Sequence, residues 1–524
     1  EERLAAIWQD VLGVPQVGIR DDFFLLGGHS LKAMTLLARI KQQLQVNVPL
    51  RVLFESPTIE ALALQIAEAD REAFAALTLV EPRDYYPVSS AQKRMFIMSQ
   101  FTGSGTSYNI PGAMFIEGEL ELDRFEQTFR RLIERHESLR TTFETVHGEA
   151  VQIVHRDVDF QVEYDRSTEV GLESIAAEFV RPFHLQKAPL LRVKLVHISA
   201  QRYLLLFDMH HIVSDGVSMG ILLNEFACLY HGDDLPELTV QYKDFSVWQN
   251  RMLGSETMRI HEAYWLETFS GEIPVLTLPT DYPRPALQSF EGDAVIVRSG
   301  QPLHDQIYKL ASECGATLYI IMLAAYQVLI AKYSGQTDII VGTPVAGRSV
   351  AETENMIGMF VNTLAIRTRP ESGKTFGQFL EEVKRSSLHA LEHQHYPLEM
   401  LIDQLELRRD LSRNPLFDTV FSVQNQDMKA SEFAGLKFEP YHRENKIAQF
   451  DLSVKAFEDE RDIVIHAEYG TQLFKKETIE RMMDDYQALL QQVTENPALL
   501  LSDIVLQRFD KLENVLPGKV EFLF

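Results

Sequence analysis

The chain has 524 residues, of which 45% are hydrophobic and 24% are charged, and its formal net charge at pH 7 is −25. This length exceeds that of most single domains, so we expect two or three domains, each with a well-formed core. The excess of acidic residues excludes nucleic acid and anionic membranes as main partners, because both are themselves negatively charged. No apolar run reaches the ~18 residues of a membrane span and no signal peptide is present, which predicts a cytoplasmic protein without membrane segments.

The first residues, EERLAAIWQD, lack a starting Met and already show helical periodicity, so we expect a fragment of a longer polypeptide. Two cysteines, Cys228 and Cys314, lie far apart in apolar stretches, which predicts buried packing residues rather than a disulfide or a metal pair. Such cysteine usage is typical of a reducing compartment.

Residues 1–72 are predicted to form a small bundle of helices. Apolar side chains recur at helical spacing over residues 4–12 and 31–44. The segment SPTIEALALQIAEA adds a third helix, with Thr58 as its cap. A domain this short can bury only one modest core.

The segment DDFFLLGGHSL connects the first two of these helices, and Gly27 and Gly28 loosen its backbone just before Ser30. Ser30 is expected to open the second helix. The unpaired N–H groups and the positive dipole end of a helix start would favour a phosphate attached to this serine. Ser30 is an equally good helix N-cap, so its position alone leaves both interpretations open.

Residues 73–86 lack periodicity and include Pro82, which is typical of a linker between domains. A linker this short keeps the helical bundle near the next domain, so a substrate tethered to the bundle would have a high effective concentration. At the other end of the chain, residues 506–524 form a tail to which the sequence assigns no role.

Between residues 87 and 505 helical and strand patterns alternate without a GxGxxG or P-loop motif, so nucleotide chemistry is not predicted. Prolines cluster at 274–288, which predicts an N-terminal lobe of about 87–270 and a C-terminal lobe of about 271–505. The clearest local patterns predict helices beginning near residues 125 and 477, and buried strands at 338–347 and 419–425.

The stretch RYLLLFDMHHIVSDGVSMG, residues 202–220, sets two histidines and an Asp-Gly pair at the end of an apolar run. The run predicts a buried strand and the residues from Val217 a helix, with Gly216 permitting a tight turn between them. Neighbouring side chains on a strand point to opposite faces, so we expect only one of His210 and His211 to be functional. An imidazole, with an unperturbed pKa of about 6.5, is suited to accept a proton from an attacking nucleophile.

Asp215 lies four residues beyond His211. It is expected either to orient the histidine ring or to pair with an arginine and hold the turn. A metal site is disfavoured, because the adjacent histidines point apart and no further Cys or His cluster lies nearby.

The pattern HHxxxDG, formed by His210, His211, Asp215 and Gly216, resembles the active-site signature of the condensation domains of nonribosomal peptide synthetases. It is shared more widely by chloramphenicol-acetyltransferase-like acyltransferases. Further segments resemble condensation-domain motifs in family order: SSAQKRM (89–95), RHESLRTTF (135–143), YKDFSVW (242–248), IGMFVNT (357–363), HQHYPLE (393–399) and RDLSRNPL (409–416). The sequence departs from the family pattern at Ser246, His395 and Leu398.

The segment DDFFLLGGHSL is similar to the core motif of peptidyl carrier domains, also called thiolation domains. In that family the serine carries 4'-phosphopantetheine, whose thiol holds an aminoacyl or peptidyl thioester. The resemblance implies covalent 4'-phosphopantetheine on Ser30, with Asp22 and Leu31 at the flanking positions. Together the two resemblances imply a small all-α carrier bundle followed by a large α/β domain of two chloramphenicol-acetyltransferase-like lobes.

The condensation-domain resemblance also implies roles for single residues. His211 is expected to contact the attacking amine, as a base or as a hydrogen-bonding positioner, and its neighbour is expected to be structural. Asp215 is expected to pair with an arginine, for which Arg348 is the candidate. The backbone N–H of Gly216 is expected to stabilise a developing oxyanion. Asn362 is expected to lie in the substrate pocket or else to be a turn residue at a strand end.

The implied reaction is peptide-bond formation in nonribosomal peptide synthesis, in which an aminoacyl or peptidyl group moves from one carrier to an amine on a downstream carrier. The segments 357–363 and 409–416 look like condensation versions of these motifs and favour condensation over epimerisation, and the intact histidine pair disfavours heterocyclisation. Because no epimerisation domain then lies between the carrier and the condensation domain, the donor is expected to be an L-aminoacyl group or a peptide that ends in one, which gives the L-donor, L-acceptor type. A non-catalytic carrier and docking module is the other alternative. The implied partners are an upstream adenylation domain, downstream adenylation and carrier domains, and a phosphopantetheinyl transferase.

Overall fold

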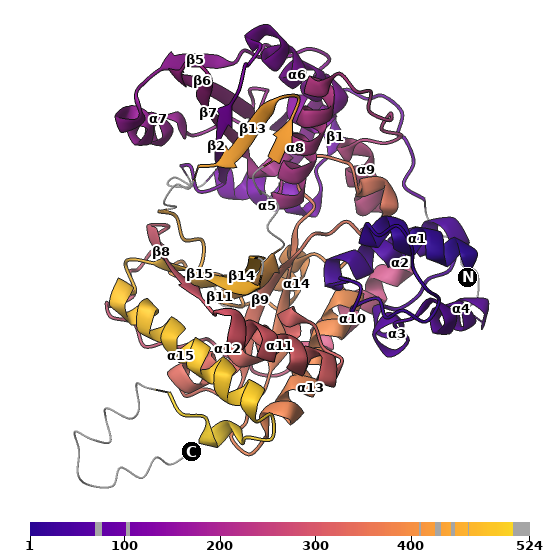
Figure 1. The fold of residues 1–524 in the computed structure, drawn as a ribbon, viewed down its shortest axis with the longest axis vertical. Coiled ribbons are helices and arrows are strands. Elements are labelled where there is room, and N and C mark those ends of the chain that lie inside the picture. The colour runs from indigo at the N-terminus through magenta and orange to yellow at the C-terminus, as the bar shows by residue number, and fades with distance from the viewer. Residues whose placement is uncertain are drawn as a thin grey trace.

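The structure is a computed structural model that describes residues 1–68, 76–100, 105–407, 410–424, 431–441, 446–459 and 461–506. Figure 1 shows two α/β lobes stacked one above the other, with a small helical domain at their side. This arrangement confirms the predicted fold class, a small all-α bundle followed by a large α/β region, and each lobe contains a mixed sheet.

The helical domain contains α1 (Glu2–Leu12), α2 (Ser30–Leu44), α3 (Leu50–Glu55) and α4 (Ile59–Glu68). The sequence predicts three of these helices and misses α3, because six residues are too few to display a helical period. The core surrounds Trp8, which is fully buried and packs edge-on against Phe23 with 5.1 Å between ring centroids. The predicted cap of α4 is confirmed, since the hydroxyl of Thr58 accepts a hydrogen bond from the backbone N–H of Ala61 at 3.3 Å.

The first lobe is built on a six-stranded sheet with the order β12-β13-β2-β7-β6-β5. Its strands are β2 (Asn109–Glu117), β5 (Glu163–Arg166), β6 (Leu191–Ser199), β7 (Arg202–His210), β12 (Ser431–Phe433) and β13 (Leu436–Pro440). Leu205 and Phe207 of β7 pack with α6 (Leu122–Arg135) and α8 (Gly216–His231), whereas Leu204 packs with α7 (Leu172–Phe179). Both faces of β7 are therefore buried, which accounts for its continuous apolar run.

A small three-stranded sheet also belongs to the first half of the chain, with β1 (Tyr86–Pro87), β4 (Glu149–Val154) and β3 (Thr141–Val146) in that order. The helix α5 (Ser90–Ser99) follows β1 directly. A complete capping box begins this helix, in which Ser89 and Gln92 bond each other's backbone N–H groups.

The second lobe contains a six-stranded sheet with the order β10-β9-β11-β14-β15-β8. Its strands are β8 (Gly292–Arg298), β9 (Ile339–Val345), β10 (Asn362–Thr368), β11 (Thr419–Gln424), β14 (Leu452–Asp459) and β15 (Asp462–Gly470). Its helices are α11 (Gln301–Cys314), α12 (Leu318–Ser334), α13 (Phe376–Glu392), α14 (Leu398–Gln404) and α15 (Lys476–Glu495). The predicted strands β9 and β11 and the predicted helix α15 are confirmed. α12 is apolar on all sides because it is buried against α13, α15 and the sheet.

The two lobes do not follow the predicted division at residue 270. The hairpin of β12 and β13 comes from the second half of the chain but extends the sheet of the first lobe, where Phe438 pairs with Ile116. Conversely, α10 (Glu256–Thr268) buries Trp265 in the core of the second lobe. A local cluster of prolines cannot reveal such exchanges, because strand pairing depends on packing against distant neighbours.

The predicted linker, residues 73–86, is partly anchored to the first half of the large region. Residues 69–75 lie outside the described residues. Leu77 and Val80 are buried, and the N–H of Val80 donates to Asp244 of α9 (Tyr242–Leu253) at 2.9 Å. Residues 77–80 of the predicted linker are therefore packed against the large region rather than exposed to solvent.

The remaining predictions about the chain ends and the cysteines have mixed outcomes. Cys228 and Cys314 are free thiols, so the expected absence of a disulfide between them holds, but both are half-buried rather than buried. Only the first residue of the predicted tail 506–524 is described: Leu506 is buried in the core of the second lobe. Residues 507–524 lie outside the described residues.

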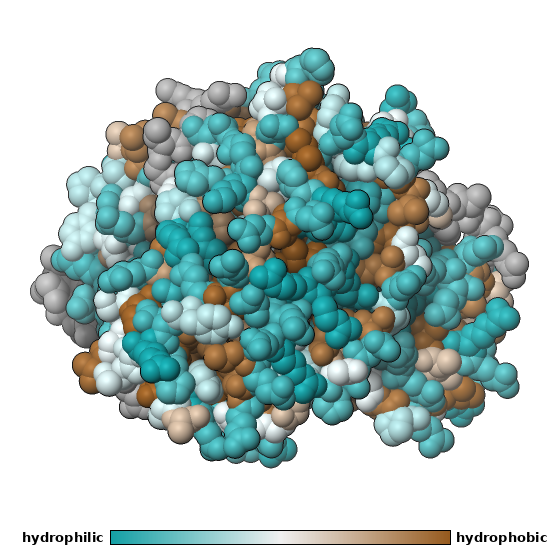
Figure 2. Space-filling view, turned by 90° about the horizontal axis from the view of Figure 1, so that it is seen from above, coloured by the Kyte–Doolittle hydropathy of each residue, from teal (hydrophilic) through white to brown (hydrophobic). Residues whose placement is uncertain are grey.

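Figure 2 shows a face of the molecule on which hydrophilic side chains predominate and hydrophobic ones are scattered among them. Among the described residues, no single helix has the length and apolar composition needed to cross a membrane. α11 and α12 pass that test only as a pair, with a bend of 104° between them. α12 is nevertheless a core helix of the second lobe.

The helical domain is seated on the second lobe (Figure 1). Its helices α2 and α3 lie against α13 and the short 3-10 helix η4 (Ala351–Thr353). Leu388 of α13 is buried in the apolar cluster that forms the core of the helical domain, and Leu391 packs at its edge. This seating directs the N-terminal end of α2 toward the space between the lobes.

Candidate functional site

A single cavity of about 3240 Å³ lies between the two lobes and receives residues from the helical domain. Gly27, Gly28 and His29, directly before α2, line one part of it, and Ala176 and Phe179 of α7 line another. The helical domain and α7 lie on opposite sides of the molecule in Figure 1. The cavity therefore crosses the molecule, and it exceeds the ~300–1,000 Å³ of an ordinary ligand pocket.

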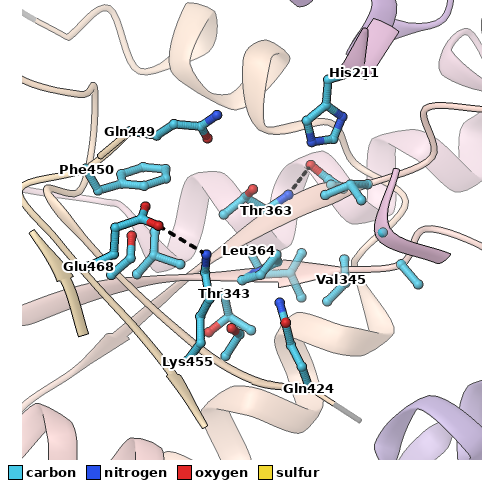
Figure 3. A pocket seen from close by; sticks show the side chains of 18 of the residues that line it. His211, Thr343, Val345, Thr363, Leu364, Gln424, Gln449, Phe450, Lys455 and Glu468 are labelled. Carbon is cyan, nitrogen blue, oxygen red and sulfur yellow. Dashed lines mark hydrogen bonds and ion pairs between the residues drawn. The ribbon is translucent and has the colours of Figure 1, made fainter. Parts of the chain in front are cut away.

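His211 lines this cavity where β7 ends. The chain leaves the strand after His210, and His211 begins the 3-10 helix η3 (His211–Val213). Its backbone N–H donates to the carbonyl of Tyr108 at 2.8 Å. In Figure 3 its imidazole projects into the cavity, toward the strand that carries Thr363.

The hydrogen bonds of His211 fix its tautomer. Nδ1 lies 2.9 Å from the carbonyl oxygen of Ser214, which can only accept, so Nδ1 carries the proton. Burial lowers the pKa of His211 below its ordinary value, against the opposing effect of Asp215. The ring is therefore neutral at pH 7, and Nε2 keeps an unshared electron pair that can accept a proton.

His210 has a different environment from that of its neighbour. It is buried and does not line the cavity, and its Nδ1 accepts a hydrogen bond from the N–H of Ile212 at 3.1 Å. Burial, followed by the proximity of His211, lowers its pKa to about 4. Its geometry is that of a neutral cap at the start of η3.

Asp215 is fully buried and caps α8. One oxygen, Oδ1, accepts hydrogen bonds from the N–H and hydroxyl of Ser218 at 2.8 and 2.7 Å, and lies 3.1 Å from Nη2 of Arg348. The other, Oδ2, accepts from the N–H of Phe360 at 3.1 Å. Because Nδ1 of His211 bonds to Ser214, Asp215 influences that ring through its charge and the shape of the turn.

Gly216 begins α8 and lines the cavity. Its φ does not lie in the left-handed region, so the backbone at this position does not require glycine. The expectation that Gly216 is needed to permit a tight turn is therefore wrong. A Cβ at this position would meet no atom within 4 Å, so the residue faces open space. The N–H groups of a first helical turn have no helical acceptor, which leaves that of Gly216 available to the cavity.

Arg348 and Asn362 both line the cavity from the second lobe. Arg348 contacts Asp215 through Nη2. Through Nη1 it donates to the carbonyls of Thr353 and Met356 at 2.5 and 2.7 Å. Asn362 is the first residue of β10, and its Nδ2 donates to the carbonyls of Gln394 and Tyr396, each at 2.9 Å. Its side-chain amide thus holds the segment before α14 in the cavity wall. Both positions expected for Asn362 are therefore found together, since it lines the pocket and lies at the end of a strand.

Ser30 is the first residue of α2, and the preceding His29 occupies the N-cap position, where its side chain accepts from the N–H of Lys32. The interpretation of Ser30 as the N-cap is therefore wrong. α2 has 15 residues, and the positive end of its dipole lies beside the cavity wall formed by Gly28 and His29. These features suit an attached phosphate, because such a helix start favours negative charge.

Sequence motifs far apart in the chain meet around η3. Gln92 donates to the carbonyl of Ile212 at 3.3 Å, and the hydroxyl of Ser89 lies 2.8 Å from that of Tyr242. Tyr242 in turn donates to the carbonyl of Met359. These motifs therefore form one hydrogen-bonded frame that holds the turn after β7.

The motif RHESLRTTF is not a solvent-exposed helix face, because its first two residues bond to α8, the helix that follows Asp215. His136 is buried, and its Nε2 lies 2.7 Å from Oε2 of Glu225 on α8. Arg135 donates to the same oxygen at 3.0 Å. The motif thus fixes α8 against α6. In the motif RDLSRNPL, the position of Arg409 lies outside the described residues.

Sequence reasoning misses three neighbours of the site. Tyr108 accepts from His211, Arg94 lines the cavity and disfavours protonation of His211, and Ser218 bridges Asp215 and Arg348. Of the three, only Ser218 could have been predicted from the sequence. It lies three residues after the N-cap Asp215, and the side chain of an N-cap accepts a hydrogen bond from the backbone N–H at that position.

Figure 3 shows the polar wall opposite His211, where Lys455 of β14 lies 3.5 Å from Glu468 of β15 beside Phe450 and Gln449. Among the described residues, no group of three or more His, Cys, Asp or Glu side chains has the geometry of a metal site. The described residues that line the cavity include the imidazole of His211 and polar side chains such as Lys455 and Gln449.

Curated relatives match nearly the whole length of this chain. The chain is 53% identical over 506 residues to tyrocidine synthase 3 of Brevibacillus parabrevis, which covers 97% of this chain and 8% of that protein. It is 50% identical over 516 residues to gramicidin S synthase 2 of Brevibacillus brevis, covering 98% of this chain and 12% of that protein. It is 45% identical over 526 residues to surfactin synthase subunit 1 of Bacillus subtilis (strain 168), covering 100% of this chain and 15% of that protein. The chain thus spans a small part of each of these relatives.

Solved structures share the fold. The X-domain from teicoplanin biosynthesis superposes with a TM-score of 0.77 at 24% identity, covering 82% of this chain and 99% of that one. The condensation domain of the Monacolin K polyketide synthase gives a TM-score of 0.71 at 23% identity, covering 81% and 100% of the two chains.

The structure thus combines a two-lobed α/β fold, a histidine that lines the cavity between the lobes, and a small helical domain that lines the same cavity. The chain belongs to the condensation-domain family, since the family model "Condensation domain" matches residues 82–512. The model "Phosphopantetheine attachment site" matches residues 2–66, so the helical domain is a phosphopantetheine carrier domain. The chain therefore consists of a phosphopantetheine carrier domain followed by a condensation domain.

Proposed function

We propose that this chain transfers an aminoacyl or peptidyl group from its own carrier domain, where it is attached through 4'-phosphopantetheine on Ser30, to the amine of an aminoacyl group on a downstream carrier. The observation that carries the proposal is the shared cavity, which is lined by Gly28 and His29 next to Ser30 and also by His211. When bound, the phosphopantetheine arm supplies a thioester-linked acyl group at the end of a flexible chain.

The chemistry required of the protein is to orient two reactants and to take one proton. The reaction forms a C–N bond and breaks the C–S bond of the thioester. The attacking amine loses a proton, and the phosphopantetheine arm leaves as a thiolate that takes up a proton to become the free thiol. Nε2 of His211 is the acceptor for that proton, because its Nδ1 is already occupied by a donated hydrogen bond. The N–H of Gly216, at the positive end of α8, faces negative charge developing on the carbonyl oxygen.

Alignment supplies much of the rate in this proposal. Effective molarities of ~10⁵ M or more are available to reactants held in one geometry. A positioned base adds a factor of about 10² to 10⁴. The size of the cavity leaves room for two tethered groups to meet end to end.

The acceptor is proposed to enter from the side of α7, because the carrier domain occupies the other end of the cavity. The proposed partners are therefore a downstream carrier with its adenylation domain, an upstream adenylation domain that loads Ser30, and a phosphopantetheinyl transferase. We assign the L-donor, L-acceptor type, because no epimerisation domain lies between the carrier domain (residues 2–66) and the condensation domain (residues 82–512).

One experiment tests the function against its alternatives. The 524-residue chain is converted with a phosphopantetheinyl transferase, loaded with an L-aminoacyl group and mixed with an aminoacyl acceptor carrier, and the mass and chirality of the products are followed. An amide product with an L-donor residue supports condensation. Racemisation of the loaded residue without an acceptor would indicate epimerisation, and loading without either product would indicate a non-catalytic docking module.

A further inference from the structure

We propose that Arg39 of the carrier domain and Glu354 of the second lobe form a docking pair that positions Arg348, so that the seated carrier domain stabilises the active-site arrangement around Asp215. Glu354 is thereby a positioning residue, which acts through Arg348 and does not itself touch the reacting atoms. The inference rests on the proposed function in taking this carrier domain as the donor.

The docking pair is a two-pronged ion pair. Nη2 of Arg39 lies 2.7 Å from Oε2 of Glu354, and Nε lies 3.1 Å from Oε1. The two side chains are 24% and 20% exposed, so the pair is largely shielded from solvent. The hydrogen bond that Arg39 donates to Glu354 is the main cause that raises the pKa of Arg39 above its ordinary value. Fork-to-fork contacts of this kind are strong and orientation-specific.

Two further contacts align the same surfaces. Gln42, one turn beyond Arg39 on α2, donates to Glu352 at 3.2 Å. The apolar cluster around Leu388 joins the carrier core to α13. Arg39 also contacts Asp10 of α1 within the carrier domain. A carrier domain that leaves its seat therefore keeps a partner for its arginine, whereas the contact of Glu354 with Arg39 is lost.

The segment that carries Glu354 also holds Arg348. The carbonyls of Thr353 and Met356, on either side of Glu354, accept the hydrogen bonds of Arg348 Nη1. The other terminal nitrogen of Arg348 lies 3.1 Å from Oδ1 of Asp215. Docking of the carrier domain at Glu354 thus positions the backbone of residues 353–356, and the carbonyl groups of that backbone hold Arg348 in place.

The continuation of this segment closes on Asp215 from the other side. The N–H of Gly358 donates to the hydroxyl of Ser218 at 3.1 Å, and the N–H of Phe360 donates to Asp215 at 3.1 Å. The guanidinium of Arg348 stacks over the ring of Phe360 at 4.1 Å. Arg348 and Phe360, at the two ends of this segment, both form hydrogen bonds with the buried carboxylate of Asp215. A displacement at Glu354 therefore changes the packing around Asp215, and with it the positions of α8 and η3.

The test compares charge reversals in the whole chain without attached phosphopantetheine. Arg39→Glu and Glu354→Arg each remove the docking pair, and the double variant Arg39→Glu/Glu354→Arg rebuilds it with exchanged charges. Arg20→Glu is the matched control, because Arg20 pairs with Glu60 at the surface of the same carrier domain, where the side chains are 80% and 45% exposed.

Two quantities are measured, one of which does not depend on catalysis. The first is hydrogen–deuterium exchange at the amides of Gly358 and Phe360, and the second is turnover of a soluble aminoacyl N-acetylcysteamine thioester with an acceptor carrier. Both single variants are expected to exchange about fivefold faster or more and to turn over at least about fivefold more slowly, in the range of ordinary site-to-site coupling. The double variant and Arg20→Glu are expected to match the wild type within about twofold.

The soluble donor bypasses the carrier, so a loss of turnover reports the active site and not substrate delivery. Unchanged exchange and unchanged soluble-donor turnover in Arg39→Glu would overturn the inference. If the wild type makes no amide from either donor, the proposed function fails. In that case, faster exchange in the single variants and recovery in the double variant would still support the docking pair.

Discussion

Arg348 of the second lobe and Asp215 of the first form an ion pair across the lobe boundary, with Nη2 3.1 Å from Oδ1 and side chains only 6% and 0% exposed. The pair is separated by 133 positions in the chain. Asp215 caps α8 and precedes Gly216, while Arg348 follows β9 and holds residues 353–356. One contact therefore fixes the spacing of the lobes and the turn that carries His211.

The first prediction concerns the removal of this arginine. Arg348→Ala is expected to lower the free energy of unfolding by about 3–5 kcal/mol, because it leaves the carboxylate of Asp215 buried without its countercharge. Urea unfolding followed by tryptophan fluorescence measures the change. The control Arg259→Ala breaks a surface pair with Glu256, with side chains 72% and 79% exposed, and is expected to cost less than about 1 kcal/mol. Equal effects of the two variants would show that the interlobe pair has no special role.

The second prediction separates the two histidines. His211→Ala is expected to reduce amide formation by about 10² to 10⁴, because it removes the proton acceptor in the cavity. His210→Ala is expected to act mainly on stability, because His210 is buried and caps η3 through its Nδ1. Single-turnover condensation and urea unfolding are measured for both variants. A His211→Ala rate within about threefold of wild type would exclude a role for this side chain in the chemistry.

The third prediction is the pH dependence of the condensation rate. Burial lowers the pKa of His211, so the neutral, proton-accepting form persists below the ordinary imidazole value of about 6.5 and is lost only as pH falls further. The acid limb of the rate that depends on His211 is therefore expected to have its midpoint below about pH 6.5. In His211→Gln the residual rate should lose this acid limb. An acid limb centred above the ordinary value would contradict the neutral environment of the ring.

The fourth prediction tests the attachment site. Ser30→Ala is expected to abolish the mass gain that the wild-type chain shows on treatment with a phosphopantetheinyl transferase and coenzyme A. Ser56→Ala is a matched control, because Ser56 lies in the same carrier domain at the end of α3. Intact-protein mass spectrometry measures the result. A mass gain that survives in Ser30→Ala would place the attachment elsewhere.

The fifth prediction uses the space around two glycines. Gly216→Ala is expected to fold normally, because the new methyl group meets no atom within 4 Å, but to slow condensation by placing that group in the cavity. Gly358→Ala is the contrasting variant, because its Cβ would lie 1.9 Å from Cδ2 of Tyr242. It is expected to destabilise the protein by about 1–3 kcal/mol through overpacking. Thermal unfolding and turnover are measured together, and full activity in Gly216→Ala would show that the cavity tolerates a methyl group there.

Much of the candidate site is readable from local sequence, because its parts are short. The apolar run of β7, the helix start at Ser30 and the pattern HHxxxDG each occupy one stretch of chain. Gly216 is the exception, since local turn chemistry predicts a role that its backbone conformation does not require.

The sequence by itself determined the elements, the motif residues and the presence of a carrier domain, because helical periodicity, strand alternation and motif spacing act over a few residues. Tertiary structure alone decided that β12 and β13 complete the other lobe, that His136 is buried against Glu225, and that the carrier domain seats through Arg39. It also decided which histidine faces the cavity, since the strand ends between the two. The strand exchange, the burial of His136 and the seating of the carrier domain depend on contacts between residues at least 89 positions apart, and no local pattern encodes which distant surface a side chain will meet.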